Sequence, residues 1–156
     1  MKKYKNFTEN EIVNPYFDGC PATKWGQLQK KTQKNLENTL DIVQHIRNIF
    51  DYSYRITSTY RPKSRGSAHQ KGKAIDFQLI GKEKNNKAHK NIMNFFEAEK
   101  SKFSNVRIFL EFQGKGMWFH IDLNFKKSKE AKLYIARPIK NKMKYEKYKG
   151  KTPLEF

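Results

Sequence analysis

The sequence predicts an α+β domain with one small, mostly antiparallel sheet and flanking helices. Two observations predict this class. Segments with helical periodicity alternate along the chain with segments rich in β-branched and aromatic residues. Two of the strand-like segments are joined by a short glycine-containing connection, which is typical of a hairpin. The length of 156 residues fits a single domain.

The first half of the chain predicts two helical segments and one strand. Thr8 and Glu11 have the spacing of a capping box, which indicates a short helical turn. Prolines and glycines then interrupt the chain before a long helix expected over 28–50. Residues 54–59 read as a strand. The long helix is predicted by apolar side chains at three- and four-residue steps, at Leu36, Leu40, Val43, Ile46 and Phe50.

The second half predicts three strands and a helix. Residues 74–79 alternate between apolar and polar side chains, as a strand with one buried face does. A helix is expected from Asn86 to about Phe103, with His89 exposed to solvent among Lys and Asn neighbours. Strands are expected over 106–112 and 117–123, joined by a four-residue glycine-containing loop.

The end of the chain is expected to be a basic extension. Residues 126–156 are dense in Lys with scattered Tyr, Ile and Leu, and they show no clean periodicity. We therefore expect one domain over residues 1–125, with residues 126–156 packed on that domain or trailing it.

Composition limits the function classes. Hydrophobic residues make up 37% of the chain, enough for a core, but no apolar stretch approaches the ~20 residues that span a bilayer. The first residues do not form a signal peptide, so synthesis in the cytoplasm is expected. The single cysteine, Cys20, cannot form an intrachain disulfide.

The net charge of +18 predicts attraction to polyanions, namely nucleic acid, anionic membrane or the acidic polymers of a bacterial envelope. No helix-turn-helix, zinc-finger or RNA-recognition pattern is present, so specific nucleic-acid binding is not expected.

Two polar residues lie where apolar ones are expected. Asp76 and His120 each interrupt an otherwise core-like strand, and a buried carboxylate or imidazole must be paired or coordinate an ion. Strand alternation places Trp118, His120 and Asp122 on one face. His69 precedes the Asp76 strand in a glycine-containing loop, so these side chains can converge.

Two histidines and one carboxylate form a familiar zinc set, and three protein ligands leave a fourth position for water, as in catalytic sites. A hydrolase of this kind also needs a general base. Glu111 is the best candidate, because it can face the His120 strand across the tight turn. Asp122 is the alternative base, although it can instead orient a metal ligand from behind. Arg61 can bind a substrate carboxylate with two hydrogen bonds.

The segment 67–76 resembles the S-x-H-x-x-G-x-A-x-D signature of the zinc peptidase family of D-Ala-D-Ala carboxypeptidases and L-alanyl-D-glutamate endopeptidases. The segment 118–120 resembles the W-x-H that follows in this family, and Glu111 resembles the acidic residue ahead of it. The strand that ends in Tyr60 and Arg61 also resembles the family, so the similarity covers roughly residues 5 to 125.

The resemblance implies zinc bound by His69, Asp76 and His120, with Glu111 as the catalytic base. It implies substrate contacts from three further residues, Arg61, Ser67 and Trp118. The implied fold is the small α+β fold shared with the Hedgehog signalling domain. The implied function is hydrolysis of amide bonds in peptidoglycan stem peptides, by a bacteriophage endolysin or a tail-associated lysin that acts at the cell wall.

Other readings remain open on the sequence alone. A non-catalytic virion structural or binding protein could keep the same fold. A nucleic-acid binder is a third reading, because Tyr and Phe interleave with Lys near the end of the chain. The sequence does not identify the bond that is cleaved.

Overall fold

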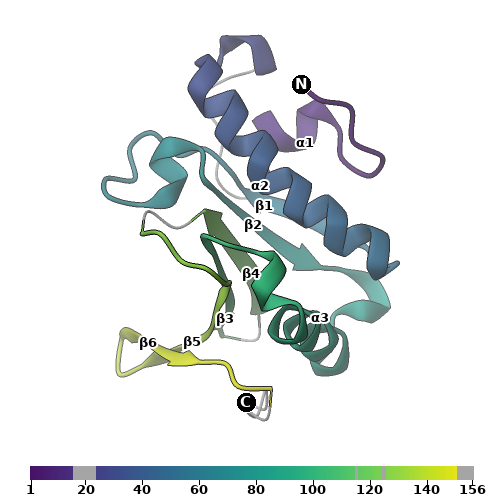
Figure 1. Cartoon of the computed structure of the whole chain (residues 1–156), viewed down its shortest axis with the longest axis vertical. Coiled ribbons are helices and arrows are strands. Elements are labelled where there is room, and N and C mark those ends of the chain that lie inside the picture. Colours follow the sequence, from purple (N-terminus) through teal and green to yellow (C-terminus); the bar gives the residue numbers. More distant parts are fainter. Residues whose placement is uncertain (16–23, 115, 124–125, 151–156) are drawn as a thin grey trace.

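A computed structural model of the chain describes residues 1–15, 24–114, 116–123 and 126–150, so Cys20 lies outside the described residues. These residues form one six-stranded sheet with the strand order β1-β2-β4-β3-β5-β6 (Figure 1). All neighbouring strands are antiparallel except β3 and β5, which are parallel. The strands are β1 (Tyr54–Ser58), β2 (Ala74–Leu79), β3 (Val106–Gln113), β4 (Gly116–Leu123), β5 (Lys132–Ile139) and β6 (Lys142–Lys147). The predicted α+β class with a mostly antiparallel sheet is confirmed.

Three α-helices accompany the sheet in the part of the chain that the structure describes. Helix α1 begins after the predicted capping box, in which Thr8 and Glu11 bond each other's backbone N–H groups. The helix predicted from Asn86 ends earlier than expected, and a short 3₁₀ turn follows it. The α-helices are α1 (Glu9–Val13), α2 (Lys30–Ile49) and α3 (Asn86–Ala98). Single 3₁₀ turns are η1 (Trp25–Gln27), η2 (Ala68–Lys71), η3 (Gly81–Glu83) and η4 (Lys100–Lys102).

The core lies between the helices and the apolar side of the sheet. Helix α2 packs against β2 and β4, and α3 packs against β5. The alternation in β2 and β4 sends Phe77 and Phe119 into this core, where both are 0% exposed. Their rings stack with centroids 5.1 Å apart. The polar side chains of the same strands therefore point to the opposite side of the sheet, which carries the candidate site.

His89 corrects one expectation from the sequence. The sequence predicts a solvated side chain, but the side chain of His89 is 0% exposed on α3 and stacks on Phe119, with ring centroids 5.4 Å apart. Its Nδ1 bonds the carbonyl of Asn85, and its Nε2 has no hydrogen-bond partner among the described residues. Burial lowers the pKa of His89. This histidine is therefore a neutral core residue.

The basic C-terminal segment also contains more regular structure than its sequence indicates. It supplies β5 and β6, and β5 pairs in parallel with β3 inside the sheet. Beyond β6, the Tyr148 side chain is 3% exposed and its hydroxyl bonds Asn94 of α3. Residues 126–150 therefore pack on the rest of the chain.

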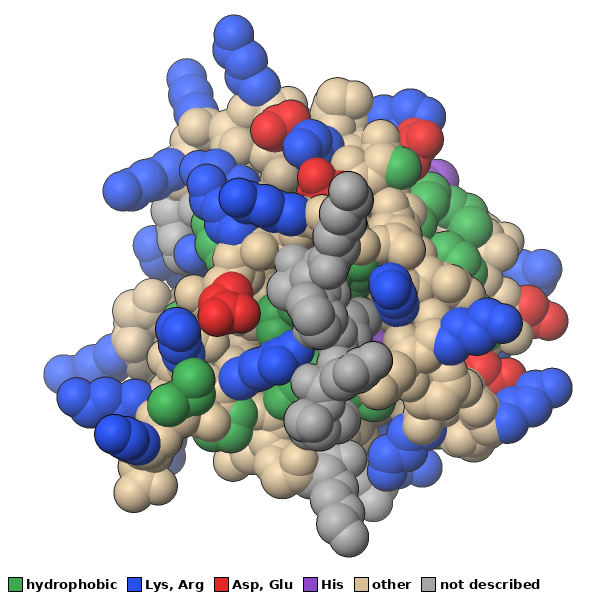
Figure 2. All heavy atoms as spheres, turned by 90° about the horizontal axis from the view of Figure 1, so that it is seen from below, with side chains coloured by type: hydrophobic (Ala, Val, Ile, Leu, Met, Phe, Trp, Pro, Cys, Tyr) green, Lys and Arg blue, Asp and Glu red, His purple; other side chains and the backbone are tan. Residues whose placement is uncertain are grey.

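Basic side chains are spread over the surface. Figure 2 shows Lys and Arg side chains at many places around one face, with a smaller number of acidic side chains among them. Among the described residues, no helix combines the length and the apolar composition needed to cross a membrane.

Candidate metal centre

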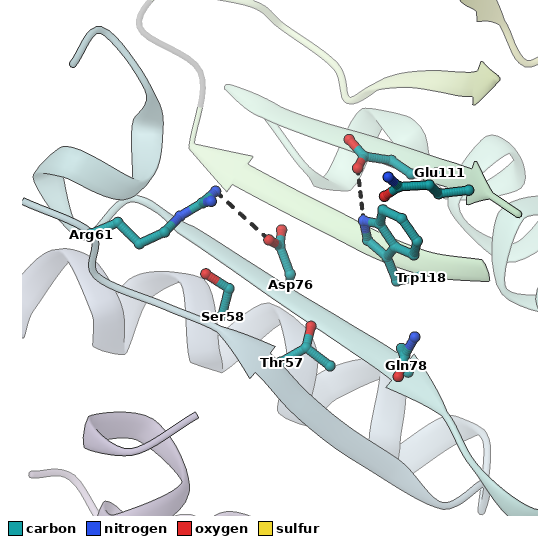
Figure 3. Close-up of a pocket in the computed structure, with 8 residues that line it drawn as sticks. Thr57, Ser58, Arg61, Asp76, Gln78, Glu111 and Trp118 are labelled. Atoms are coloured by element: carbon teal, nitrogen blue, oxygen red, sulfur yellow. Dashed lines mark hydrogen bonds and ion pairs between the residues drawn. The ribbon is translucent and has the colours of Figure 1, made fainter. Parts of the chain in front are cut away.

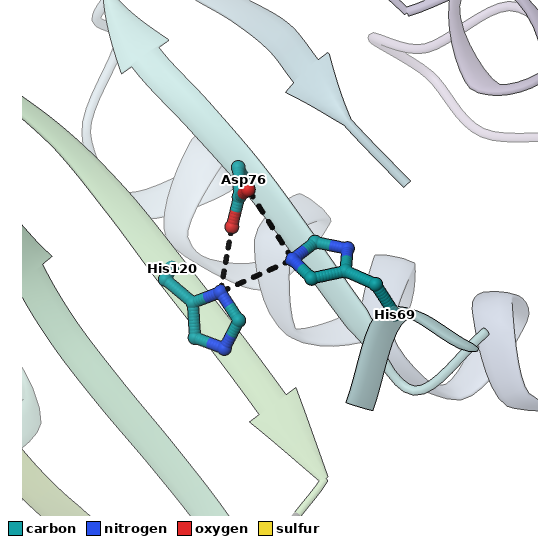
Figure 4. A group of neighbouring side chains, drawn as sticks. All are labelled: His69, Asp76 and His120. Carbon is teal, nitrogen blue, oxygen red and sulfur yellow. Dashed lines mark hydrogen bonds and ion pairs between the residues drawn. The ribbon is translucent and has the colours of Figure 1, made fainter. Parts of the chain in front are cut away.

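Three predicted ligands meet on the polar side of the sheet. His69 lies on η2, Asp76 on β2 and His120 on β4, and Figure 4 shows their side chains converging. Asp76 and His120 are direct cross-strand partners, so the pairing of β2 with β4 brings them together. One ligand atom from each residue lies within 4.8 Å of the others.

Two of the donor separations match those around a tetrahedral ion. His69 Nε2 is 3.3 Å from His120 Nδ1 and 3.2 Å from an Asp76 oxygen. Ligands about 2.0–2.1 Å from a tetrahedral zinc ion are separated by about 3.3–3.4 Å. His120 Nδ1 lies 2.7 Å from the other Asp76 oxygen, a hydrogen-bond distance that is shorter than the tetrahedral spacing. The three residues therefore form a donor set that could hold a metal ion.

His69 is held with the correct nitrogen facing the centre. Its Nδ1 lies 2.5 Å from the carbonyl oxygen of Thr59, which can only accept, so Nδ1 carries the proton. The lone pair of Nε2 is left facing Asp76. Gly72 ends η2 with φ +66°, and a Cβ on it would lie 2.9 Å from a Thr32 side-chain carbon of α2. This close approach explains why the loop has glycine here.

His120 is oriented from behind by a second carboxylate. Its Nε2 lies 3.0 Å from an oxygen of Asp122, which is 1% exposed. Arg107 donates to both oxygens of Asp122, from Nε at 2.8 Å and from Nη2 at 2.6 Å. A carboxylate on the far nitrogen of a ligating histidine fixes the ring and increases its basicity. Asp122 is thus fully engaged in holding His120.

The electrostatics of the centre favour a positive charge between its carboxylates. Burial alone would lower the pKa of His120, but hydrogen bonds to Asp122 and Asp76 raise it to about 10. Burial alone would raise the pKa of Asp76, but the hydrogen bond from His120 is the main cause that holds it below its ordinary value. The same arrangement would attract a divalent cation.

Glu111 stands on β3 beside the centre. It is the cross-strand partner of Trp118 on β4, and the indole N–H donates to its carboxylate at 2.7 Å. Burial raises the pKa of Glu111 above the ordinary range, although the charge of His120 and the hydrogen bond from Trp118 oppose the rise. A carboxylate with a raised pKa beside a metal centre is suited to accept and return a proton near neutral pH.

A cavity of about 430 Å³ opens on the β1 side of the centre. Figure 3 shows Arg61 reaching toward Asp76, with a guanidinium nitrogen 3.9 Å from the carboxylate. Ser58 also faces this cavity, and its hydroxyl is buried with no partner among the described residues. A buried hydroxyl without a partner is available to a ligand. The cavity is lined by Thr57, Ser58, Arg61, Asp76, Gln78, Glu111, Gln113 and Trp118.

A second cavity, of about 410 Å³, opens on the β5 side. Ser67 borders this second cavity, whereas Arg61 and Trp118 border the first. The Ser67 hydroxyl bonds that of Ser64 at 2.9 Å. The residues expected to contact substrate are therefore divided between two cavities, and Glu111 borders both.

The structure places all eight expected site residues around one centre, and it adds two residues that are not among the predicted ones. These are Thr59, whose carbonyl orients His69, and Arg107, which holds Asp122. Arg107 could have been found from the predicted hairpin, because a loop over 113–116 already pairs it with Asp122. The carbonyl of Thr59 has no sequence signal.

Comparison of the chain with protein-family models, with curated proteins and with solved structures found no match.

Proposed function

We propose that this chain is a zinc-dependent peptidase that hydrolyses amide bonds in the stem peptides of bacterial peptidoglycan. One observation carries the proposal. Two histidines and an aspartate from distant parts of the chain converge with their ligand atoms within 4.8 Å of one another, beside a partly buried glutamate. This combination of an ion site and a nearby base is what metal-assisted hydrolysis requires.

The chain's own residues account for binding of the ion and for proton transfer. His69, Asp76 and His120 would hold the ion, which would polarise the scissile carbonyl and activate water. Glu111 accepts a proton from the attacking water and returns it to the leaving amine nitrogen. The alternative base, Asp122, is unsuited to this step because Arg107 and His120 occupy both of its oxygens.

The first cavity suits the part of a peptide that carries a carboxylate. Arg61 places a guanidinium at its border, next to the ion site. Planar guanidinium groups bind carboxylates with two parallel hydrogen bonds. The neutral polar groups of Ser58 and Gln78 also line this cavity and can bond peptide N–H and C=O groups.

The choice of substrate rests on the resemblance described above and on charge. The signature over 67–76 and the W-x-H over 118–120 are the residues that build the centre. The net charge of +18 would draw the protein to the anionic polymers of a bacterial envelope. With this function we also propose the Hedgehog-like variant of the α+β fold and a role as an endolysin or a virion-associated lysin.

Digestion of purified peptidoglycan tests the proposal, with released fragments identified by mass. Glu111→Gln is expected to retain zinc and lose activity, whereas His120→Ala is expected to lose both. His45→Ala is the matched control, because His45 is exposed on α2 and is not among the grouped ligands. Zinc content is measured on the same samples.

The alternatives predict different results. A non-catalytic binding protein would bind wall without releasing fragments, with or without zinc. A nucleic-acid binder would bind duplex or single strands with an affinity that falls steeply with salt. Equal digestion by the wild type and both variants would refute the assigned roles.

A further inference from the structure

The second cavity is built partly by the C-terminal strands. Its walls are the η2 loop on one side and aromatic residues of β3, β5 and β6 on the other. His120 and Glu111 lie at its border, so it opens directly onto the candidate centre. Because Glu111 also borders the first cavity, the two cavities flank the catalytic residues on opposite sides.

Three aromatic rings form the wall that the C-terminal strands supply. Phe109 of β3 stacks on Tyr134 of β5, with ring centroids 4.9 Å apart and planes at 17°. Tyr145 of β6 meets the edge of Phe109 at 5.7 Å and 80°. Tyr145 is nevertheless 55% exposed, which is unusual for a large ring in contact with others. This ring therefore presents apolar surface to the solvent beside the centre.

The cationic side chains that border the second cavity are paired with carboxylates. Arg107 and Asp122 both border it, but they neutralise each other through two hydrogen bonds. Glu111 lies at its boundary with the first cavity. His120, the other cationic side chain at its border, is hydrogen-bonded to Asp76 and to Asp122, so both lining cations already face a carboxylate.

We propose that this second cavity is a subsite for an uncharged group rich in C–H bonds, on the acyl side of the scissile amide, with Tyr145 as its contact residue. The inference rests on the proposed function, which places the carboxylate-bearing side of the substrate in the first cavity. Ring faces bind apolar groups by contact area and by the quadrupole of the ring. The group could be an aliphatic peptide side chain or the sugar to which a stem peptide is attached.

Binding of short probes to the zinc-loaded protein tests the subsite. One probe is an N-acetylated, amide-capped alanine, and the other is the same amino acid joined to an N-acetylmuramyl group. Both are uncharged, and mass measurement confirms that they remain intact. Tyr145→Ala is expected to weaken binding of the preferred probe by about three- to tenfold. Tyr145→Phe is expected to bind as the wild type does.

The matched control is Ile139→Ala, which removes another exposed apolar side chain, 48% exposed, from the same pair of strands outside the cavity. Preference for the sugar-bearing probe would identify the sugar as the group, and equal binding would identify the aliphatic side chain. The subsite is refuted if neither probe binds, if Tyr145→Ala has no effect, or if Ile139→Ala weakens binding equally. Tyr145-dependent binding without digestion of peptidoglycan would refute the proposed function alone.

Discussion

Replacement of Asp122 by asparagine tests whether the second carboxylate supports a metal centre. Asp122 accepts from Arg107 at 2.8 and 2.6 Å and from His120 Nε2 at 3.0 Å. Asparagine keeps the shape but offers one acceptor oxygen and places an N–H group against one of these donors. We therefore expect Asp122→Asn to leave His120 less basic and less firmly oriented.

The expected magnitude follows from two separate effects. Partners that orient metal ligands typically contribute 10- to 100-fold to metal affinity, which corresponds to about 1.4–2.7 kcal/mol. The charged bonds to Arg107 also stabilise the fold. Because the Arg107 side chain is 31% exposed, water replaces part of this contribution, and we expect a loss of only about 1–2 kcal/mol in the free energy of unfolding.

Two measurements separate these effects. Zinc affinity is measured by titrating the metal-free protein against a competing chromophoric chelator, and stability is measured by urea unfolding without metal. Asp41→Asn is the matched control, because Asp41 pairs with Lys2 at 2.8 Å and its side chain is 46% exposed. Zinc affinity in Asp122→Asn equal to that of the wild type would show that Asp122 does not support a metal ligand. An equal loss in both variants would show that the effect is not local.

Three further predictions test other parts of the molecule. Trp118→Phe removes a hydrogen bond that lowers the pKa of Glu111, so the pKa of Glu111 should rise. The acidic limb of the pH–rate profile should then move to higher pH, and an unchanged profile would contradict the assignment of Glu111 as the base. Gly72→Ala should cost roughly 2–4 kcal/mol in urea unfolding, because a Cβ would lie 2.9 Å from a side chain of α2 in addition to its unfavourable φ. Gly66 also has a positive φ, but a Cβ on it would meet open space, so Gly66→Ala should lower the free energy of unfolding by only about 1–2 kcal/mol. Equal losses in the two variants would show that contact with α2 does not contribute to the effect at Gly72. Burial lowers the pKa of His89 below its ordinary value of 6.5 in the folded protein. As the pH falls below about 6.5, the unfolded chain therefore binds more protons than the folded protein does, and the folded protein loses stability. Below this pH, the free energy of unfolding of the wild type in urea should fall by up to about 1.4 kcal/mol per pH unit relative to that of His89→Leu. If the two free energies change with pH in parallel, the burial of a neutral His89 is refuted.

Local patterns were sufficient to predict most of the fold. The apolar steps of the long helix and the alternation over 74–79 matched α2 and β2, because both patterns report directly which side chains are buried. The predicted hairpin loop also set the register of β3 and β4. That register pairs Glu111 with Trp118 and Arg107 with Asp122, so much of the site follows from one turn.

The missed elements depend on contacts between distant segments. Strand β5 pairs in parallel with β3, and parallel neighbours have no turn between them to show in the sequence. Strand β6 lies at the edge of the sheet and is mostly exposed, so it lacks an apolar alternation. The polar neighbours of His89 predict an exposed side chain, whereas its burial comes from stacking on Phe119 of β4.

The overall charge of the chain and the charge of the centre act over different distances. Basic residues outnumber acidic ones by 33 to 15, yet Asp76, Glu111 and Asp122 all lie at the centre. Exposed charges are screened beyond about 8 Å at physiological ionic strength, so the basic surface acts on the encounter with an anionic polymer. The carboxylates of the centre are largely buried and are screened much less. A cation can therefore be held inside a strongly basic protein, because the local arrangement of side chains, and not the net charge, sets the potential at the ion site.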